Sequence, residues 1–358
     1  MIRTEKALKW GVTTGSCAAL AAKAAALKLI EGKSVTCVDI PFPDGSRLKY
    51  AILAVSGDGV SASATVIKDA GDDPDVTDGA KIKVTLATND SGAINFHAGT
   101  GVGTISRAGL AIVPGEAAIN PGPRSMIRAA LAEVCSGGFE VTVAVTAGEK
   151  LAEKTFNPRL GIVGGISILG TTGRVRPFSA PALRDALKCS LAVAVAAKID
   201  QLVLVPGNMG NKAAQHCFAV RPDQIVDVSN EWGFMLAEVQ KHSFKKLLVV
   251  GHPGKLAKLP RGQWQTHSAQ SSSAVPYICE LAEELFSQPL TQVNTVEELF
   301  MQRLNVRQRT QLGNRLAGEI SHAIENNYPH LAPNTVVLIN LKRQIIGQAG
   351  ELSAWIKS

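Results

Sequence analysis

The sequence predicts an α/β protein of two domains, with an α+β N-terminal part and a C-terminal domain on an open, mostly parallel Rossmann-like sheet. Three observations lead to this class. The chain has 358 residues, about twice the length of a typical single domain. It has 33 glycines and many alanines but only 5% aromatic residues, and small residues let helices pack closely on sheets. Short apolar runs alternate with helical segments in the second half, which is typical of parallel βαβ units.

The N-terminal part opens with a predicted helix over residues 13–30. Thr13 or Thr14 can cap its start, alanines and lysines fill its body, and Gly32 follows its end. Further predicted elements are strands over 35–40, 47–55, 61–68, 80–86 and 139–146, with a helix over 124–134. The first two strands are joined by a proline- and glycine-containing turn at 41–46, and the next two bracket an acidic loop.

The second half contains a long predicted helix over 181–198 and apolar strands over 201–205, 246–250 and 335–340. The first strand runs into Gly207-Asn208 and the second into Gly251-His252. In open parallel sheets ligands bind beyond the carboxyl ends of the strands, so these loops are a predicted site. We expect domains over 1–180, with threonine-, glycine- and aspartate-rich loops, and over 181–358.

Composition excludes several classes of protein. No apolar run approaches the roughly 18 residues of a membrane span, and the first residues lack the pattern of a signal peptide, so we expect a cytoplasmic enzyme. The six cysteines are scattered, without a C-x-x-C pair or a clustered Cys/His spacing. Neither a disulfide framework nor a metal site in the protein is therefore expected.

The chain carries a formal net charge of +7, with a pI of about 9.1. Its basic residues are dispersed, without the lysine and arginine runs of a nucleic-acid binder. An anionic small-molecule substrate explains this charge, and so does a simple contribution to solubility. Binding to nucleic acid or to a membrane is not expected.

Two N-terminal loops have the composition of binding loops. The segment 11–17 places two glycines and three hydroxyl residues, Thr13, Thr14 and Ser16, at a helix start, where N–H groups favour anions. Ordinary capping needs only one such hydroxyl. The acidic loop 68–79 does not match the EF-hand spacing. Its aspartates either form turns or bind donor hydroxyls, accept protons or stabilise a cation.

Two later loops have a similar character. The segment 156–177 is rich in glycine and contains three arginines, but it matches neither a P-loop nor a G-x-G-x-x-G motif. Glycines let a ligand approach the backbone, and arginines bind carboxylates with two hydrogen bonds; a buried strand with a tight turn is the alternative. In the segment 251–258, His252 at a strand end could transfer a proton. Segment 120–124 adds a candidate anion clamp.

In order along the chain, these loops resemble the CbiD family, the cobalt-precorrin-5B C1-methyltransferases of anaerobic cobalamin biosynthesis. The matching stretches are TTGSCAALAAKAA (13–25), KDAGDDPDVTDG (68–79), PGEAAINPGPR (114–124), TFNPRLGIVGGISILGTTGRVRP (155–177), VPGNMG (205–210), VSNEWGFML (228–236), GHPGKLAKL (251–259) and THS (266–268). They span nearly the whole chain in collinear order. Departures from the family pattern are Ser16 in place of threonine, the segment 100–103, and the segment 271–274, where the family usually has an acid and an arginine.

The resemblance implies S-adenosylmethionine as methyl donor and a cobalt-containing tetrapyrrole as acceptor, with cobalt-precorrin-6A as product. Cobalt then arrives with the substrate, and no metal ligands are needed. The tetrapyrrole rim bears acetate and propionate groups, which fits a basic protein. Whether the chain forms a homo-oligomer, or transiently contacts neighbouring enzymes of the pathway, stays open.

Under this resemblance we assign roles as hypotheses. The donor-binding residues are expected to be Gly170, Thr171, Thr172, Gly173, Gly207 and Asn208. The substrate-binding residues are expected to be Thr13, Thr14, Ser16, Arg124, Arg159, Arg174 and Lys255. The catalytic residues are expected to be His252, for proton transfer, and Asp69 and Asp72, with Asp73 as an alternative carboxylate.

Without the resemblance, two other functions fit the loops. A nucleotide-dependent phosphotransferase would use glycine and threonine loops to hold phosphates, although the G-K-[ST] motif is absent. A tetrapyrrole carrier without enzymatic activity would bind the macrocycle but not S-adenosylmethionine.

Overall fold

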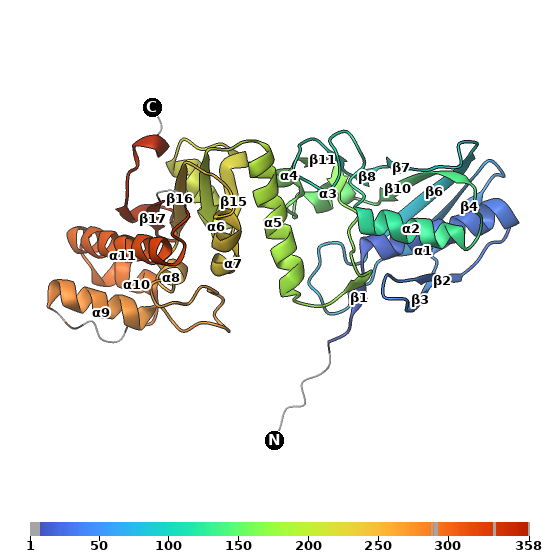
Figure 1. The fold of residues 1–358 in the computed structure, drawn as a ribbon. Helices are drawn as coiled ribbons and strands as arrows, with labels where there is room; N and C mark the ends of the chain where they lie inside the picture. The colour runs from blue at the N-terminus through green and yellow to red at the C-terminus, as the bar shows by residue number, and fades with distance from the viewer. Residues whose placement is uncertain (1–7, 288, 290–292, 332–333, 357–358) are drawn as a thin grey trace, which may run out of the picture. The chain divides into compact units, whose positions relative to one another are not determined.

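The computed structural model describes residues 8–287, 289, 293–331 and 334–356. The chain divides into two compact units, Met1–Ala180 and Pro181–Ser358, which we call unit 1 and unit 2 (Figure 1). Both units combine helices with a five-stranded sheet, so the chain is of mixed α/β class. Among the described residues, no helix has the length and apolarity needed to cross a bilayer.

Unit 1 is organised around α1 (Thr14–Glu31), which confirms the first predicted helix. The Thr13 side chain caps its start by accepting from the N–H of Ser16, and Gly32 ends it in the left-handed conformation with φ of 67°. Its first two-thirds is almost wholly buried, because alanines on every side let neighbouring elements approach its backbone. Sequence composition and tertiary packing therefore agree for this helix.

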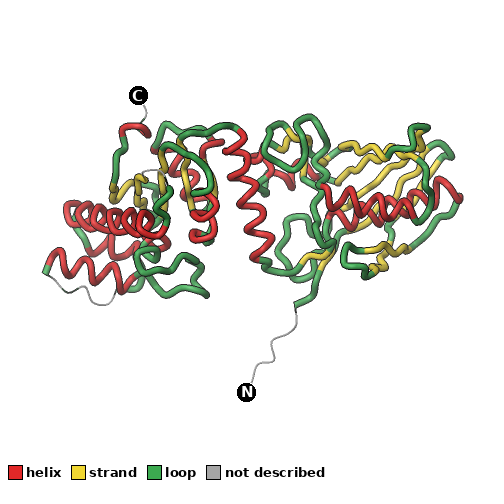
Figure 2. The backbone as a smooth tube through the Cα atoms, viewed as in Figure 1, coloured by secondary structure: helices red, strands yellow, loops and turns green. Residues whose placement is uncertain are grey.

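The sheet of unit 1 has the order β4-β5-β6-β10-β7. Its strands are β4 (Ala54–Gly57), β5 (Ser61–Ile67), β6 (Lys81–Asn89), β7 (Ile94–Ala98) and β10 (Gly138–Val145), antiparallel except for the β10–β7 pair. Alternate residues of β5 and β6 are buried, which is the pattern of a sheet covered on one face. α1 and α2 (Pro121–Ala132) pack against each other, and α1 packs on β5 and β6 (Figure 2).

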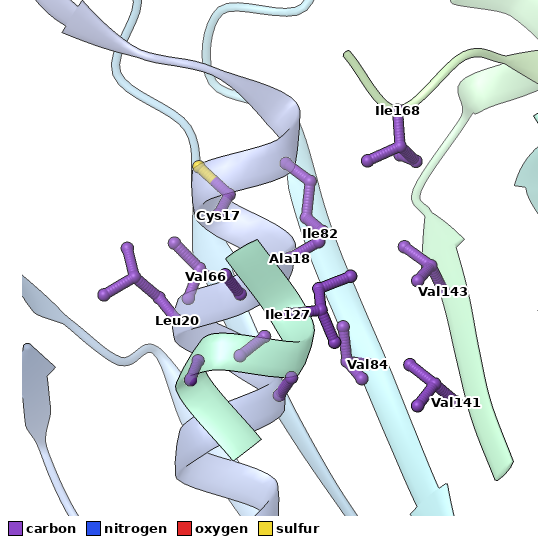
Figure 3. Packing of buried hydrophobic residues seen from close by; sticks show 14 of the residues in the cluster. Cys17, Ala18, Leu20, Val66, Ile82, Val84, Ile127, Val141, Val143 and Ile168 are labelled. Atoms are coloured by element: carbon purple, nitrogen blue, oxygen red, sulfur yellow. The ribbon is translucent and has the colours of Figure 1, made fainter. Parts of the chain in front are cut away.

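Aliphatic side chains of modest size form the core between these layers. Figure 3 shows Cys17, Ala18 and Leu20 of α1 close to Val66 of β5 and to β6, with the side chain of Ile127 from α2 beside them. All of these residues are buried. Burial raises the pKa of the Cys17 thiol to about 12, so this cysteine is a packing residue.

Several predicted boundaries in unit 1 are wrong, and two of these differences have a clear physical cause. The predicted strand 47–55 is two strands, β3 (Arg47–Ala51) and β4, because the chain leaves one sheet and enters another at residues 52–53. β3 forms a hairpin with β2 (Cys37–Pro41) through the predicted turn. The predicted helix 124–134 begins three residues earlier, since prolines are tolerated in a first helical turn whose N–H groups need no partner.

Short elements that the sequence did not predict connect distant parts of unit 1. They are β1 (Gly11–Val12), β8 (Gly101–Val102), β9 (Thr104–Ile105), α3 (Gly148–Ala152), α4 (Asn157–Leu160), β11 (Ile162–Val163), β12 (Gly165–Ile166) and β13 (Arg174–Val175). β1 pairs with β13, β8 with β12, and β9 with β11. Two-residue ladders give no periodic signal, so they depend on tertiary structure.

Unit 2 contains an open sheet of order β15-β14-β16-β17-β18. The strands are β14 (Gln201–Val205), β15 (Ile225–Asp227), β16 (Lys246–Gly251), β17 (Asn334–Ile339) and β18 (Ile345–Ala349), of which β18 alone is antiparallel to its neighbour. The three predicted strands are confirmed within one residue, and their parallel pairing is observed. The sequence did not predict β15, which has three residues, or β18.

Helices cover both faces of this sheet. Leu202 and Leu204 of β14 belong to a core with α5 (Ala180–Ala196), α7 (Trp232–Val239), α9 (Val275–Phe286) and α11 (Val306–Asn327). Val203 and Val205 point into a second core, which contains residues of α6 (Asn208–Cys217) and Trp355. Because side chains alternate along a strand, burial on both faces requires a continuous apolar run, which is what these strands have. The short helix α8 (Pro253–Leu256) follows β16, and the short helix α10 (Val296–Glu298) lies between α9 and α11.

Candidate functional site

In unit 1, the predicted glycine and threonine loops meet at the N-terminus of α1. Thr14 Oγ1 accepts from the N–H of Leu169 at 2.9 Å and lies 3.3 Å from its carbonyl oxygen, to which it donates. The N–H of Gly15 also donates to the Leu169 carbonyl, at 2.8 Å. The N–H of Thr13 and the hydroxyl of Ser16 both donate to the carbonyl of Gly173, at 3.1 and 2.5 Å. Loops 155 residues apart in sequence are therefore joined.

These contacts engage the hydroxyls predicted to bind substrate. Ser16 is fully buried and Thr14 is 5% exposed. A buried hydroxyl needs an internal partner, and each of these has one on the loop that follows Leu169. In this structure the hydroxyls of Thr14 and Ser16 join α1 to residues 169–173, whereas the hydroxyl of Thr13 caps the helix and contacts that of Ser16 at 3.0 Å. Their role toward substrate stays a prediction.

Two glycines let this loop approach α1 closely. Gly170 has φ of 144° and Gly173 has φ of 81°. A Cβ on Gly170 would lie 2.3 Å from Thr13 Oγ1, and one on Gly173 would lie 2.4 Å from the Phe42 ring. Glycine is required at both positions by conformation and by space. Between them, Thr171 and Thr172 are exposed, and the Thr172 hydroxyl bonds the backbone of Arg174.

The acidic loop lies beside the same helix start. The N–H of Val12 donates to the carbonyl of Asp69 at 2.8 Å, and Gly11 lies against Ala70. Lys9 binds both predicted carboxylates, its amine to Asp69 at 2.6 Å and its N–H to Asp72 at 2.7 Å. The hydrogen bond from the Lys9 amine holds the pKa of Asp69 below its usual value. Asp69 is therefore suited to act as a carboxylate.

An ion pair between the buried Lys68 and Asp75 holds the acidic loop. Lys68 is 2% exposed, and its amine donates to Asp75 at 2.9 Å. Asp75 also accepts from the N–H and hydroxyl of Thr77. Asp73 accepts from the N–H of Phe178 at 3.0 Å, which ties the loop to the end of the 156–177 segment. The loop thus has a fixed conformation with Asp69 and Asp72 on its accessible side.

The predicted arginines have different surroundings. Arg124 donates to the Ile119 carbonyl at 2.8 Å and to Glu116 at 2.7 Å. The guanidinium of Arg174 lies over the Phe42 ring at 4.5 Å and donates to Ser46 at 3.0 Å. Arg159 lies on α4, with its guanidinium 5.8 Å from the ring centre of Phe156. Arg174 belongs to the loop at the α1 start, and Arg124 to α2, whose Gly122 lies against Gly170.

In unit 2, the predicted residues lie at the carboxyl edge of the sheet. Gly207 follows β14 with φ of 92° and ψ of −169°, a conformation that is essentially restricted to glycine. Its N–H donates to Asp227 Oδ1 at 2.9 Å, and the N–H of Ser229 donates to the same oxygen at 2.7 Å. A Cβ on Gly207 would meet no atom within 4 Å, so space is open above this turn. Asn208 begins α6 directly after it.

His252 follows β16, the neighbouring strand. Its Nδ1 accepts from the N–H of Gly254 at 3.0 Å and so caps α8. Because Nδ1 accepts, the ring proton is on Nε2, which lies 3.1 Å from Glu297 Oε2. Glu297 also accepts from the N–H of Leu341. Both ring nitrogens are engaged, and proton transfer by His252 stays a prediction.

Lys255 is a cation at this edge that has few contacts with other polar groups. The structure gives its amine no hydrogen bond or ion pair within the described chain. Partial burial lowers its pKa, opposed by the charge of Asp227, while the charge of Lys258 lowers it further. A half-buried amine without a carboxylate partner is available for an anionic ligand.

Sequence reasoning missed Asp227. It ends β15, is 7% exposed, and stands 20 residues after Gly207. A short apolar run that ends in an acid, about 20 residues after a glycine turn, is a signal known from nucleotide-binding units. The sequence analysis also omitted Glu297 and the fully buried Asn340, which follows β17 at the same edge.

The structure thus groups the predicted residues in two sets. Unit 1 holds Thr13, Thr14, Ser16, Asp69, Asp72, Arg124, Gly170, Thr171, Thr172, Gly173 and Arg174, with Arg159 on a separate short helix. Unit 2 holds Gly207, Asn208, His252 and Lys255. The residues predicted to bind the donor are divided between the units. Within the described ranges, no group of three His, Cys, Asp or Glu side chains is arranged to hold a metal ion.

Comparisons with known proteins give consistent names. A family model described as CbiD matches residues 1–177. A cobalt-precorrin-5B C(1)-methyltransferase of Syntrophotalea carbinolica is 48% identical over 352 residues, covering 97% of this chain and 99% of that protein. The protein of that name from Ralstonia nicotianae is 40% identical, covering 82% of this chain and 81% of its own. A crystal structure titled cobalamin biosynthesis protein (cbiD), from Archaeoglobus fulgidus, is 28% identical with a TM-score of 0.39, covering 72% of this chain and 81% of that one.

Proposed function

This chain belongs to the CbiD family and is a cobalt-precorrin-5B C1-methyltransferase of cobalamin biosynthesis, and from this premise we propose how its residues divide the reaction. We propose S-adenosylmethionine as the methyl donor. In the reaction the carbon–sulfur bond of the sulfonium breaks as a bond forms between the methyl group and C1. The electron pair returns to sulfur, and no covalent intermediate with the enzyme is needed. Cobalt enters as part of the substrate.

Such a displacement depends on alignment. Holding a donor and a carbon nucleophile in line can supply effective molarities of about 10⁵ M or more. The sulfonium charge is lost as the reaction proceeds, so a site that excludes water favours the transition state. The enzyme therefore needs rigid loops that accept a ligand close to the backbone. Gly207 is a position of that kind, because a Cβ there would meet no atom within 4 Å, whereas Thr13 and Phe42 occupy the space beside Gly170 and Gly173.

The carboxyl edge of the unit 2 sheet is our first candidate for donor binding, and we propose that this unit is a Rossmann-like domain. The order β15-β14-β16-β17 changes direction between β14 and β16, and ligands of open α/β sheets bind at such a switch point. The observation that carries the assignment is the glycine-only turn at Gly207, open above and held by Asp227. Gly210 supports it, since a Cβ there would lie 2.9 Å from Val205 and prevent close packing of α6.

The loops at the start of α1 are the second candidate. Their backbone is rigid, Thr171 and Thr172 are exposed, and Asp69 and Asp72 lie nearby on the adjoining loop. As the alternative, we propose that these loops bind the donor within unit 1, with Asp69 or Asp72 accepting donor hydroxyls.

Cationic side chains are proposed to hold the carboxylates of the tetrapyrrole. Arg124, Arg159 and Arg174 already contact other groups in this structure, so a ligand must share or replace those contacts. Lys255 needs no such exchange. We propose Lys255 as the principal clamp in unit 2. Its substitution by alanine should weaken tetrapyrrole binding roughly tenfold, the usual loss of a charge-assisted hydrogen bond.

Calorimetric titration tests the proposal against its rivals. Purified protein is titrated with S-adenosylmethionine, with Mg-ATP and with the cobalt-tetrapyrrole, and incubated with methyl-labelled donor to locate the new methyl group. We expect binding of S-adenosylmethionine and label at C1. Binding of Mg-ATP alone would indicate a phosphotransferase, and binding of the macrocycle without the donor would indicate a carrier. Lys212→Ala, at an exposed lysine of α6, is the control for Lys255→Ala.

A location in the cytoplasm is also proposed, because both the donor and the proposed tetrapyrrole substrate are small water-soluble metabolites. Self-association or contact with neighbouring enzymes of the pathway is compatible with this function. Sedimentation of the purified protein, alone and with substrate, measures the first of these.

A further inference from the structure

One lysine of unit 2, Lys258, is buried without a carboxylate partner among the described residues. Lys258 lies one turn beyond Lys255 and is 7% exposed. Its amine donates to the Thr266 carbonyl at 3.1 Å and to the Ser271 hydroxyl at 2.8 Å. An ammonium group has three protons, and both acceptors are neutral. No carboxylate of the described residues lies within 4.0 Å of it.

Such a group is costly for a folded protein. Burial of a charge without an opposite charge costs several kcal/mol, and the protein meets this by lowering the pKa or by supplying an anion. Burial does lower the pKa of Lys258, with no opposing charge among the causes. The Lys68–Asp75 pair of unit 1 shows the contrasting arrangement, in which a buried lysine has a carboxylate at 2.9 Å.

Lys258 lines a cavity of about 150 Å³, whose wall also holds other hydrogen-bond donors. They are Arg261, Gln263, Ser272, Ser273 and Tyr277. Glu280 is the acid in the lining, and it lies 3.6 Å from Arg261, with both side chains more than half exposed. The charged lining residues are thus two cations and one anion, which leaves one net positive charge.

Internal hydrogen bonds hold Lys258, Gln263 and Ser272 of the lining and the neighbouring Ser271. The Ser271 hydroxyl donates to the His267 carbonyl at 2.8 Å and accepts from Lys258. The Gln263 amide donates to the Ser272 hydroxyl, and the N–H of Gln263 donates to the Lys258 carbonyl. Burial raises the pKa of Tyr277 to about 12, so its hydroxyl stays neutral and can donate. A preformed wall of donors around one net positive charge suits a carboxylate.

We propose that this cavity binds one acetate or propionate side chain of the tetrapyrrole substrate, with Lys258 and Arg261 as its cationic contacts. The proposal rests on the proposed function. A carboxylate with one or two methylene groups is small enough for the volume, and the tetrapyrrole is the reactant that carries such groups. Lys255 and Lys258 would then hold the substrate periphery at adjacent points. Neither Lys258 nor Arg261 takes part in bond making.

The decisive experiment compares Lys258→Met with Ser271→Ala in the full-length protein. Lys258→Met keeps the length and apolar stem of the side chain but removes its charge. Ser271→Ala removes one of the two internal bonds of Lys258 and leaves the charge in place. For both variants, the dissociation constants of the cobalt-tetrapyrrole and of S-adenosylmethionine are measured by calorimetry, and the unfolding midpoint by circular dichroism.

We expect Lys258→Met to weaken tetrapyrrole binding about tenfold, with donor binding unchanged, and Ser271→Ala to leave both constants within about twofold. Arg261→Gln should weaken tetrapyrrole binding in the same direction. If both Lys258→Met and Ser271→Ala lower the midpoint but leave tetrapyrrole affinity unchanged, Lys258 only holds the 263–273 loop and the proposal is wrong.

A second readout separates this proposal from the proposed function. Lysine labelled with ¹³C at Cε reports the environment of each amine by NMR, and sodium propionate is the probe. We expect the Lys258 signal, assigned by its loss in Lys258→Met, to shift saturably with propionate. If the wild type transfers methyl groups but shows no such shift, and Lys258→Met keeps its tetrapyrrole affinity, only the proposal that the cavity binds a substrate carboxylate is wrong. A protein without methyl transfer refutes the proposed function.

Discussion

At the scale of single residues, the main feature is how many polar groups are already engaged. The hydroxyls of Thr14 and Ser16 bond backbone of the 169–173 loop, and both ring nitrogens of His252 have partners. Lys255 and Lys258 differ, because no carboxylate of the described chain neutralises either amine within 4.0 Å. Residues of the first kind hold loops together, and for Lys255 and Lys258 we propose binding of an anion.

Gly173 and Gly164, which have similar φ angles, allow a matched test of close approach. Both have positive φ, 81° and 86°, but a Cβ meets the Phe42 ring in one case and no atom within 4 Å in the other. Gly164→Ala should lower the free energy of unfolding by about 1 kcal/mol through backbone strain alone. Gly173→Ala should lower it by about 3 kcal/mol, since overpacking adds to the strain. Urea denaturation measures both free energies of unfolding. Equal decreases in the two variants would contradict the close contact between Gly173 and the Phe42 ring.

Substitution of His252 separates capping from proton transfer. His252→Asn keeps an acceptor for the N–H of Gly254, and His252→Ala keeps none. Because both ring nitrogens are engaged, we expect His252→Asn to retain kcat within a factor of about three, and His252→Ala to lose about 1 kcal/mol of stability. Steady-state methyl transfer and thermal unfolding give the two quantities. A loss of kcat of about 10² or more in both variants would indicate proton transfer instead.

At the scale of elements, a cluster of ion pairs joins α1 and α2 to the hairpin of β2 and β3. Glu133, at the C-terminus of α2, binds Arg47 of β3 through two hydrogen bonds of 2.8 and 2.9 Å. Arg47 also binds Asp39 of β2, and Lys23 of α1 binds Glu133. A carboxylate at a helix C-terminus opposes the helix dipole, so its position depends on these two cations.

This cluster predicts a pH dependence of stability. Hydrogen bonds from Arg47, then Lys23, lower the pKa of Glu133 from 4.5 to about 2. A group with a lowered folded-state pKa stabilises the protein above its unfolded pKa and loses that effect as pH falls. At pH 6 the free energy of unfolding of the wild type should exceed that of Glu133→Gln by about 1 kcal/mol, a value that allows for solvent screening. This difference should disappear as the pH falls from 4.5 to 2. Urea denaturation across this range measures it, and a difference independent of pH would contradict the assignment.

At the scale of the whole molecule, each unit has hydrophobic cores of its own. The core of unit 1 uses residues up to Ile168, and the two cores of unit 2 use residues from Leu183 onward. No described residue belongs to a core of both units. Local stability should therefore be set separately in each unit.

Hydrogen exchange tests this independence. Leu86 of β6 is fully buried in unit 1, and Leu86→Ala should cost about 2 to 5 kcal/mol through lost burial and a residual cavity. We expect faster exchange of the amides of β5, β6 and β10, with those of β14, β16 and β17 unchanged. Leu204→Ala in β14 is the reciprocal variant, expected to affect unit 2 alone. Equal acceleration in both units after either substitution would show that they unfold together.

The sequence by itself determined much of this protein. Long periodic or continuous apolar segments, such as 13–30 and 201–205, gave α1 and β14 nearly to the residue, because capping and burial act locally. The order of glycine and threonine loops identified the family, because strings such as those at 13–25 and 155–177 resemble it closely, and the comparisons confirm that family. Local patterns were sufficient wherever the physical cause was itself local.

Only the tertiary structure decided which loops meet. Two-residue ladders such as β1–β13, the break at residues 52–53 and the short strand that ends at Asp227 have no periodicity to read. The environments of Lys255 and Lys258 were also hidden, because burial and the absence of a nearby carboxylate are properties of packing and not of spacing along the chain. Charge and close approach act through space, and the fold sets those distances.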